Sequence, residues 1–273
     1  MRIETDLSAA AARELLAAAV REAGRLALGF FRPGAATAAE VKSKVGGSPV
    51  TEADLAADAL LKARLLEAFP EAGWLSEETV DNAERLARRA VLIVDPIDGT
   101  RAFMAGDPRW AVSAALVVDG RPFAGAVHAP ALDETYAAAR GEGAQMNGAA
   151  IATAPPPDPR RFTAAGPRPV LQAMAARIGA SIDIAPRVPS LAYRLCMAAR
   201  GAISIATVAE NAHDWDIAAA DVILQEAGGR LIDASGAQLV YNRNQTRRGA
   251  LLATPEPLAL GLLQAFRAAT GVR

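Results

Sequence analysis

The residues best suited to chemistry follow an apolar run that ends at residue 94. Residues 91–94 are Val-Leu-Ile-Val, and the chain continues with Asp95, Pro96, Ile97, Asp98, Gly99 and Thr100. A strand over this run would hold both carboxylates rigidly, and we expect it to stop at Pro96, whose φ is fixed at about −65°. Carboxylates are hard ligands that suit Mg²⁺, and Gly99 lets backbone N–H groups approach an anion. The segment predicts a divalent metal held against phosphate, with Thr100 orienting a water.

The same residues also have a purely structural interpretation. A strand that ends in an Asx-turn and a helix that starts after Gly99 would use Asp-Gly-Thr in the same way. If that helix forms, its N-terminal dipole would add to the attraction for phosphate. From this stretch alone, both interpretations stay open.

Two distant segments add further acids in a suggestive order. Glu77 and Glu78 follow Trp74-Leu75-Ser76, and Asp214 and Asp216 flank Trp215 at a predicted helix start. Taken alone, the glutamates would be a solvated turn, because paired acids are usually exposed. Either aspartate, taken alone, would be an acid favoured by the helix dipole. We expect Asp214 to be such an early-turn acid or an N-cap, so that its replacement has only a mild effect on activity.

With all three segments present in this order, the chain resembles the inositol monophosphatase superfamily of Mg²⁺-dependent, lithium-sensitive phosphomonoesterases. The family pattern is an acidic pair, then Asp-Pro-Ile/Leu-Asp-Gly-Thr, then Trp-Asp-x-Ala-Ala/Gly, and the resemblance runs from about Lys42 to Ile232. Three spaced motifs are far more specific than one. The resemblance implies an α/β fold with mixed α+β sheets in a layered αβαβα arrangement, and a metal site between its two halves.

The resemblance also implies a role for each acid, with two or three Mg²⁺ ions as cofactor. Glu77 and Asp95 would hold the ion that activates water, helped by the carbonyl of Ile97. A second ion, which steadies the leaving oxygen, would be held by Asp95, Asp98 and Asp216. Thr100 would align the water with Glu77, and the N–H groups of Gly99 and Thr100 would bind phosphate.

An upstream segment has two interpretations. Thr51 with Asp54 three residues later is a variant of a helix capping box, which needs no catalysis to explain it. The family, however, places a lysine and a Val-Thr-x-x-Asp segment beside the metal site, and the matching residues here are Lys42, Val50, Thr51 and Asp54. Inositol-specific members carry an acid where this chain has Ser48, so the carboxylate partner of Thr100 is left open.

Substrate choice depends on weaker signals. The segments around Ser48 and Glu77 look closer to the bacterial branch that converts 3′-phosphoadenosine 5′-phosphate to AMP, and Arg187 or Arg194 would then meet the second phosphate. Inositol 1-phosphate is the alternative: its family ligand is an acid seven residues before Asp216, where this chain has Ala209, with Glu210 one residue later. Histidinol phosphate, fructose 1,6-bisphosphate and a degenerate metal-binding scaffold stay open as well.

Other phosphatase classes lack their residues. The single cysteine, Cys196, is followed by Arg200, too close for a phosphate loop of a cysteine phosphatase, and the chain has two histidines, too few for a histidine-rich metal site. The Asp214-Trp215-Asp216 triplet does not follow an apolar strand directly, as it would in an aspartyl-phosphate enzyme. Carboxylates therefore serve as ligands, and water is the nucleophile.

Composition indicates one compact enzyme acting on a small molecule. The 273 residues are 52% hydrophobic with a net charge of −1, which gives no general attraction for nucleic acid or a membrane surface. The chain lacks an apolar run of the roughly 20 residues that span a bilayer, and its start does not resemble a secretory signal. We expect a cytoplasmic protein, and a homodimer is the state often found in the family.

Helices and strands are predicted to alternate. Helices are expected over 7–30, 51–69, 169–179, 190–200 and 214–227, and strands near 90–95, 110–118, 121–129, 133–139, 161–165 and 201–207. Asp119-Gly120 predicts a tight hairpin. The prolines at 155–157 predict a boundary between an N-terminal α+β half (1–154), with most metal ligands, and a C-terminal α/β half (155–273), with Asp216 and the specificity residues.

Overall fold

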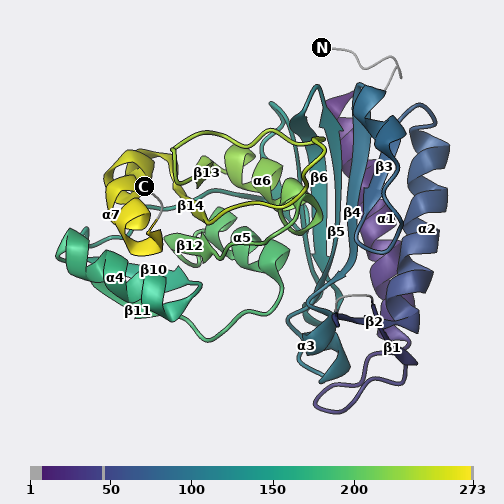
Figure 1. Cartoon of the computed structure of the whole chain (residues 1–273), viewed down its shortest axis with the longest axis horizontal. Coiled ribbons are helices and arrows are strands. Elements are labelled where there is room, and N and C mark those ends of the chain that lie inside the picture. Colours follow the sequence, from purple (N-terminus) through teal and green to yellow (C-terminus); the bar gives the residue numbers. More distant parts are fainter. Residues whose placement is uncertain (1–7, 45–46, 272–273) are drawn as a thin grey trace.

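The computed structural model describes residues 8–44 and 47–271, which form five alternating layers of helix and sheet (Figure 1). Helices α1 (Ala9–Leu28) and α2 (Glu52–Ala68) cover the outer face of a seven-stranded sheet. Helices α5 (Leu191–Ala199) and α6 (Asp214–Glu226) lie between this sheet and a five-stranded one. The last layer consists of α4 (Arg168–Ile178) and α7 (Ala259–Thr270). The predicted αβαβα arrangement is confirmed.

The larger sheet runs in chain order and is antiparallel except for its first pair. Its strands, in spatial order, are β3 (Gly73–Ser76), β4 (Ala90–Asp98), β5 (Ala111–Val118), β6 (Arg121–Ala129), β7 (Glu134–Ala139), β8 (Ala144–Met146) and β9 (Ala149–Ile151). The hairpin between β5 and β6 turns at Asp119 and Gly120, whose φ values of 51° and 71° suit a tight turn of the predicted kind. Helices cover both faces, so β5 is buried along its whole length.

The smaller sheet mixes parallel and antiparallel pairs. Its strands, in spatial order, are β11 (Ser181–Ile184), β10 (Arg161–Ala165), β12 (Ile205–Val208), β14 (Leu251–Pro255) and β13 (Gly229–Asp233). A separate two-stranded hairpin pairs β1 (Val41–Ser43) with β2 (Pro49–Thr51), and a short helix, α3 (Thr100–Met104), follows β4.

One hydrophobic core joins the two sheets through the middle helices. It contains Val91 of the larger sheet, Ile217 of α6 and Leu251 of the smaller sheet. Close packing is required where α6 crosses β6, because a Cβ on Gly125 would lie 2.8 Å from the Ala219 Cα. The middle of α6 is thereby held close to the larger sheet.

The predicted helices are confirmed within a few residues, with the expected start at Leu7 lying outside the described residues. The strand expected over 201–207 is shorter, Ile205–Val208. The prediction that β4 stops before Pro96 is wrong: β4 runs on to Asp98. Among the described residues, no helix combines the length and hydropathy needed to cross a membrane.

Candidate active site

A bulge in β4 brings two carboxylates to the same site. Asp95 and Asp98 are three residues apart, and in a regular strand they would point to opposite faces. Opposite them, Ser113 pairs with Asp95 and Ala111 with Asp98, so β4 has one more residue than β5 between these pairs. The bulge lets both carboxylates face one site. Pro96 sits inside it, where a missing N–H costs no ladder hydrogen bond.

A third carboxylate joins these two from α6. Oxygens of Asp95, Asp98 and Asp216 all lie within 4.8 Å of one another. Burial raises the pKa of Asp95 well above its usual range, and Glu77 and Asp98 raise it further. Burial likewise raises the pKa of Asp98 to about 6 and that of Asp216 well above normal. The group concentrates negative charge away from water.

These residues fit a hard divalent cation. The Oδ2 atom of Asp95 is buried and has no hydrogen-bond partner among the described residues, whereas its Oδ1 accepts from the Ile97 N–H at 3.1 Å. A buried carboxylate oxygen without a donor is costly unless a cation meets it. An all-oxygen donor set is what Mg²⁺ prefers.

Glu77 lies outside that tight group and is paired with a lysine. It follows β3, and its N–H donates to the Val94 carbonyl at 3.3 Å, which ties it to β4. The Lys44 Nζ lies 2.8 Å from the Glu77 carboxylate and 2.7 Å from that of Glu78. Lys42, the lysine expected here, is exposed and 3.5 Å from Glu40 instead. Lys44, directly after β1, therefore lies where Lys42 was expected.

Asp54 resolves which carboxylate accompanies Thr100. Its Oδ2 accepts from the Thr51 N–H at 2.8 Å, which completes the predicted capping box of α2. Its Oδ1 accepts from the Thr100 hydroxyl at 3.2 Å, and the same hydroxyl lies 3.1 Å from the Ile97 carbonyl. The same aspartate thus completes the capping box and accepts from Thr100. The acid missing at Ser48 is therefore not needed as a partner for Thr100.

The turn after Asp98 exposes backbone donors. Gly99 has φ of 93°, in the left-handed region that other residues rarely adopt, and a Cβ there would lie 3.3 Å from the Ser190 N. The first N–H groups of α3 lack intrahelical acceptors. Because α3 has five residues, these N–H groups, rather than the expected helix dipole, would attract an anion.

One oxygen of Asp98, Oδ2, is fixed by the start of α5. The Ser190 hydroxyl and the Ala192 N–H both donate to Asp98 Oδ2 at 2.6 Å. Ser190 is the N-cap of α5, a helix that packs against the smaller sheet. This contact was not predicted from the sequence, although a serine directly before an apolar helical run is an N-cap signal.

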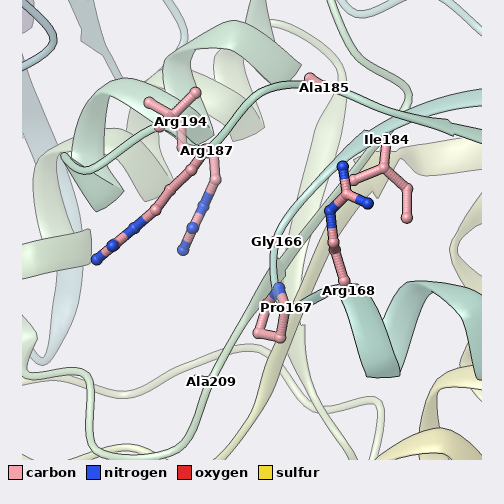
Figure 2. A pocket seen from close by; sticks show the side chains of 9 residues that line it. Gly166, Pro167, Arg168, Ile184, Ala185, Arg187, Arg194 and Ala209 are labelled. Carbon is pink, nitrogen blue, oxygen red and sulfur yellow. The ribbon is translucent and has the colours of Figure 1, made fainter.

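Two cavities open beside one another at this point. The first, of about 230 Å³, is lined by Ser48, Pro49, Glu77, Asp95, Asp98, Gly99, Thr100, Arg101, Ala102, Arg187, Pro189 and Asp216. The second, of about 450 Å³, is lined by Gly166, Pro167, Arg168, Ile184, Ala185, Arg187, Val188, Arg194 and Ala209 (Figure 2). We call them the acidic pocket and the arginine pocket. Arg187 lines both.

The arginine pocket carries unbalanced positive charge. In Figure 2 the side chains of Arg187 and Arg194 extend side by side and Arg168 rises from the opposite wall. Within residues 8–44 and 47–271, none of the three has a carboxylate within 4.0 Å, and the buried Arg194 Nε has no hydrogen-bond partner. Burial lowers the pKa of Arg194, and the negative charge of Asp98 partly offsets this by raising it. An anion bound in the pocket would offset this charge and give the Arg194 Nε an acceptor.

The sequence profile of the inositol monophosphatase family matches residues 10–269 of this chain. The chain belongs to the inositol monophosphatase family. It is 34% identical over 232 residues to a histidinol-phosphatase of Chlorobaculum parvum, which covers 81% of this chain and 85% of the relative. Inositol monophosphatase 2 of Solanum lycopersicum is 31% identical, covering 80% and 86%.

Another relative is the 3′(2′),5′-bisphosphate nucleotidase CysQ of Aggregatibacter actinomycetemcomitans. It is 30% identical, and the match covers 76% of this chain and 80% of the relative. The solved structure of the extragenic suppressor protein SuhB from Bartonella henselae has a TM-score of 0.79 at 26% identity, covering 94% of this chain and 98% of that one. As a family member, the chain is a metal-dependent hydrolase of phosphate monoesters.

Other predicted residues of this family member lie as follows. Glu210 is exposed and lines neither cavity, although Ala209 lines the arginine pocket. His213 is the N-cap of α6, and Cys196 is buried in the core. Asp214 starts α6 but is not the exposed acid that a mild effect would require: it is fully buried and paired with Arg248 at 2.6 Å.

Proposed function

We propose that the acidic pocket holds two or three Mg²⁺ ions and hydrolyses a small phosphate monoester with water as nucleophile. The carboxylates of Glu77, Asp95, Asp98 and Asp216 and the carbonyl of Ile97 would be the ligands. The observation that carries this proposal is the convergence of the buried carboxylates of Asp95 and Asp98 with the partly buried carboxylate of Asp216, where one Asp95 oxygen has no hydrogen-bond partner among the described residues. When bound, Mg²⁺ lowers the pKa of a water and offsets charge on the phosphate and the leaving oxygen.

The chain's own groups would orient the nucleophile. The Thr100 hydroxyl hydrogen is directed to Asp54 Oδ1 or to the Ile97 carbonyl, so its oxygen lone pairs are available to accept a hydrogen bond from a water. Glu77, on the neighbouring strand end, would hold the same water. The N–H groups of Gly99 and Thr100 would donate to the phosphate oxygens, as the open turn after Asp98 allows.

For the substrate we propose 3′-phosphoadenosine 5′-phosphate, converted to AMP. A nucleoside bisphosphate carries a second phosphate, and the arginine pocket beside the acidic pocket offers Arg168, Arg187 and Arg194 without an acid in its lining. The unpartnered Nε of Arg194 would gain an acceptor in the bound state. A relative named as a bisphosphate nucleotidase supports the same class.

The competing substrates suit this lining less well. Inositol 1-phosphate presents hydroxyl groups, for which Glu210 was the candidate ligand, but Glu210 lies outside both cavities. Histidinol phosphate carries an ammonium group, which three arginines would repel, even though a histidinol-phosphatase is among the relatives. Fructose 1,6-bisphosphate shares the second phosphate, and the assay below separates it from the nucleotide.

The test is phosphate release by the whole chain from four substrates: 3′-phosphoadenosine 5′-phosphate, fructose 1,6-bisphosphate, inositol 1-phosphate and histidinol phosphate. We expect activity with Mg²⁺, none in excess chelator, and recovery when Mg²⁺ is restored. Millimolar Ca²⁺ should inhibit, because Ca²⁺ prefers longer bonds and more ligands than a Mg²⁺ site offers. By family resemblance lithium should inhibit too.

Two results would contradict the proposal in different ways. Full activity in excess chelator would refute the metal-dependent mechanism. A higher kcat/KM for fructose 1,6-bisphosphate, inositol 1-phosphate or histidinol phosphate than for 3′-phosphoadenosine 5′-phosphate would leave the mechanism intact and refute the proposed substrate.

A further inference from the structure

A short segment far along the chain is paired with the residues that lead into α6. The Arg248 N–H donates to the Ala212 carbonyl at 2.7 Å, and the Asn211 N–H donates to the Arg248 carbonyl at 2.9 Å. The Asp214 N–H donates to the Thr246 carbonyl at 3.0 Å. Residues 246–248 therefore fix the backbone up to the first residue of α6.

A buried ion pair strengthens the same junction. The Arg248 Nε and Nη2 atoms both lie 2.6 Å from Asp214 Oδ1. The Asp214 side chain is 0% exposed and that of Arg248 13% exposed, so water does little to screen them. Losing either partner would leave the other charge buried and uncompensated.

Arg248 is itself held from other directions. Its Nη2 donates to the Val240 carbonyl at 2.8 Å, and its guanidinium lies 5.0 Å from the centre of the Tyr241 ring. Because a planar guanidinium with several fixed contacts has little freedom, the position of Asp214 is set by the segment from 240 to 248.

This junction lies two residues before Asp216. Asp216 Oδ2 accepts from the His213 N–H at 2.6 Å, so one of its oxygens is already oriented by the backbone that residues 246–248 hold. The His213 ring stacks on Trp215 and its Nδ1 lies 3.0 Å from the Thr246 hydroxyl. A shift of the first turn of α6 would therefore move the Asp216 carboxylate relative to Asp95 and Asp98.

We propose that Arg248 is a positioning residue for the acidic pocket: through Asp214, it fixes the first turn of α6 so that Asp216 meets Asp95 and Asp98 in a geometry that binds metal tightly. This inference rests on the proposed role of Asp216 as a metal ligand. Its ligand class is a divalent cation, and its effect is on affinity for that cation.

The test is calorimetric titration of the whole chain with Mg²⁺ alone, without substrate. Arg248→Met keeps most of the side-chain volume and removes the ion pair. We expect its Mg²⁺ affinity to fall by about tenfold or more, the scale of losing a group that orients a metal ligand. The Mg²⁺ concentration for half-maximal activity should rise by the same factor, with kcat at saturating Mg²⁺ changing less.

A matched control separates positioning from general destabilisation. Tyr241→Phe removes the hydroxyl that donates to Asp221 Oδ2 at 2.8 Å, a buried contact to the same helix about two turns further on. We expect it to lower the thermal midpoint while leaving Mg²⁺ affinity within about twofold of wild type, since Asp216 is not displaced. The double variant Asp214→Asn/Arg248→Met leaves no unpaired buried charge, and should recover stability but not Mg²⁺ affinity.

The outcomes are distinguishable. Wild-type Mg²⁺ affinity in a folded Arg248→Met protein would overturn the inference, and so would equal losses in Arg248→Met and Tyr241→Phe. If Arg248→Met does not fold, Arg248→Lys is the substitute, since it keeps the charge but cannot contact Asp214 through two nitrogens. It must then show weakened Mg²⁺ binding, or the inference fails. Wild-type affinity in Asp216→Asn would instead refute the proposed metal ligand.

Discussion

The acidic pocket and the arginine pocket lie next to each other but carry opposite charge. The acidic pocket collects Glu77, Asp95, Asp98 and Asp216, with no described ion pair except that of Glu77 with Lys44. The arginine pocket collects cations on apolar walls such as Ile184 and Val188. A net charge of −1 for the whole chain hides this separation. Bound together, a metal cation and an anionic substrate would neutralise both.

The two pockets are also built differently. The acidic pocket stands mainly on a buried strand and the bulge at Pro96, so its carboxylates are fixed by the core. The arginine pocket is formed by side chains from the ends of β10 and β11 and from α5, and Arg168 and Arg187 are exposed. The difference fits the proposed division of roles, in which the carboxylates on the buried strand perform the reaction and the more exposed arginines select the substrate.

The largest effect is expected in the acidic pocket. Asp95→Asn keeps the shape of the side chain and removes the charge of a residue proposed to contact two ions. We expect kcat to fall by at least about a hundredfold for every substrate, the order seen when a key electrostatic group is lost. Steady-state phosphate release measures this. The control is Asp119→Asn, an exposed residue paired with Arg89 at 3.2 Å, which should be near wild type.

Near-normal turnover by Asp95→Asn would remove the acidic pocket from the mechanism. A loss confined to one substrate would instead mean that the division between the two pockets is wrong.

A smaller effect is expected at the residue that lines both pockets. Arg187→Ala removes a cation that faces the monoester phosphate as well as the second anion, so KM should rise for inositol 1-phosphate and for the bisphosphate alike. A charge-assisted contact contributes about 1.5 kcal/mol or more, which corresponds to roughly tenfold. If KM rises for the bisphosphate alone, Arg187 acts only in the arginine pocket, although it lines both pockets.

The smallest effect is on stability and depends on pH. Burial raises the pKa of Asp98 to about 6, above the unfolded value of about 3.9. The stability that its protonated form contributes without metal is complete below about pH 4 and is lost as pH rises through about 6. Mg²⁺ binds the deprotonated carboxylates, so the thermal midpoint with Mg²⁺ should exceed that with chelator by a gap that widens from pH 5 to 8.

Thermal unfolding at several pH values measures this gap, which should grow by several degrees, at about 2–4 °C per kcal/mol for a chain of this size. In Asp98→Asn, the difference in thermal midpoint between Mg²⁺ and chelator should grow less with pH than in the wild type. A gap that stays constant from pH 5 to 8 in the wild type would show that the buried acids do not control metal binding.

The sequence predicted the acidic pocket well because its residues occur in compact motifs. Asp95, Asp98 and Thr100 fall within six residues, and Asp216 sits in a helix start that the Trp-Asp pattern marks. The capping box of Thr51 and Asp54 was also predicted, but its second use, as acceptor for Thr100, depends on α2 lying against β4. Local patterns do not contain that contact.

What the sequence could not predict depends on register and tertiary assembly. Lys42 lies in β1 and Lys44 directly follows it, and nothing local distinguishes the two lysines, yet of the two only Lys44 contacts Glu77. Pro96 was predicted to end a strand, but a bulge accommodates it because β5 pairs on both sides of it. Arg187 and Arg194 were candidates from the sequence, but Arg168, which lines the same pocket, was not. The ion pair of Asp214 with Arg248 joins residues far apart in sequence.

The division between the two pockets is tested most directly by the ratio of kcat/KM values for 3′-phosphoadenosine 5′-phosphate and inositol 1-phosphate. Arg194→Met keeps most of the volume of the partly buried Arg194 and removes its charge, and Arg168→Ala removes the charge of the exposed Arg168 from the opposite wall. We expect either variant to raise KM for the nucleotide by roughly ten- to a hundredfold, from about 1.5–3 kcal/mol per charge-assisted contact, while inositol 1-phosphate turnover stays nearly unchanged. An equal change for both substrates in both variants would contradict the account.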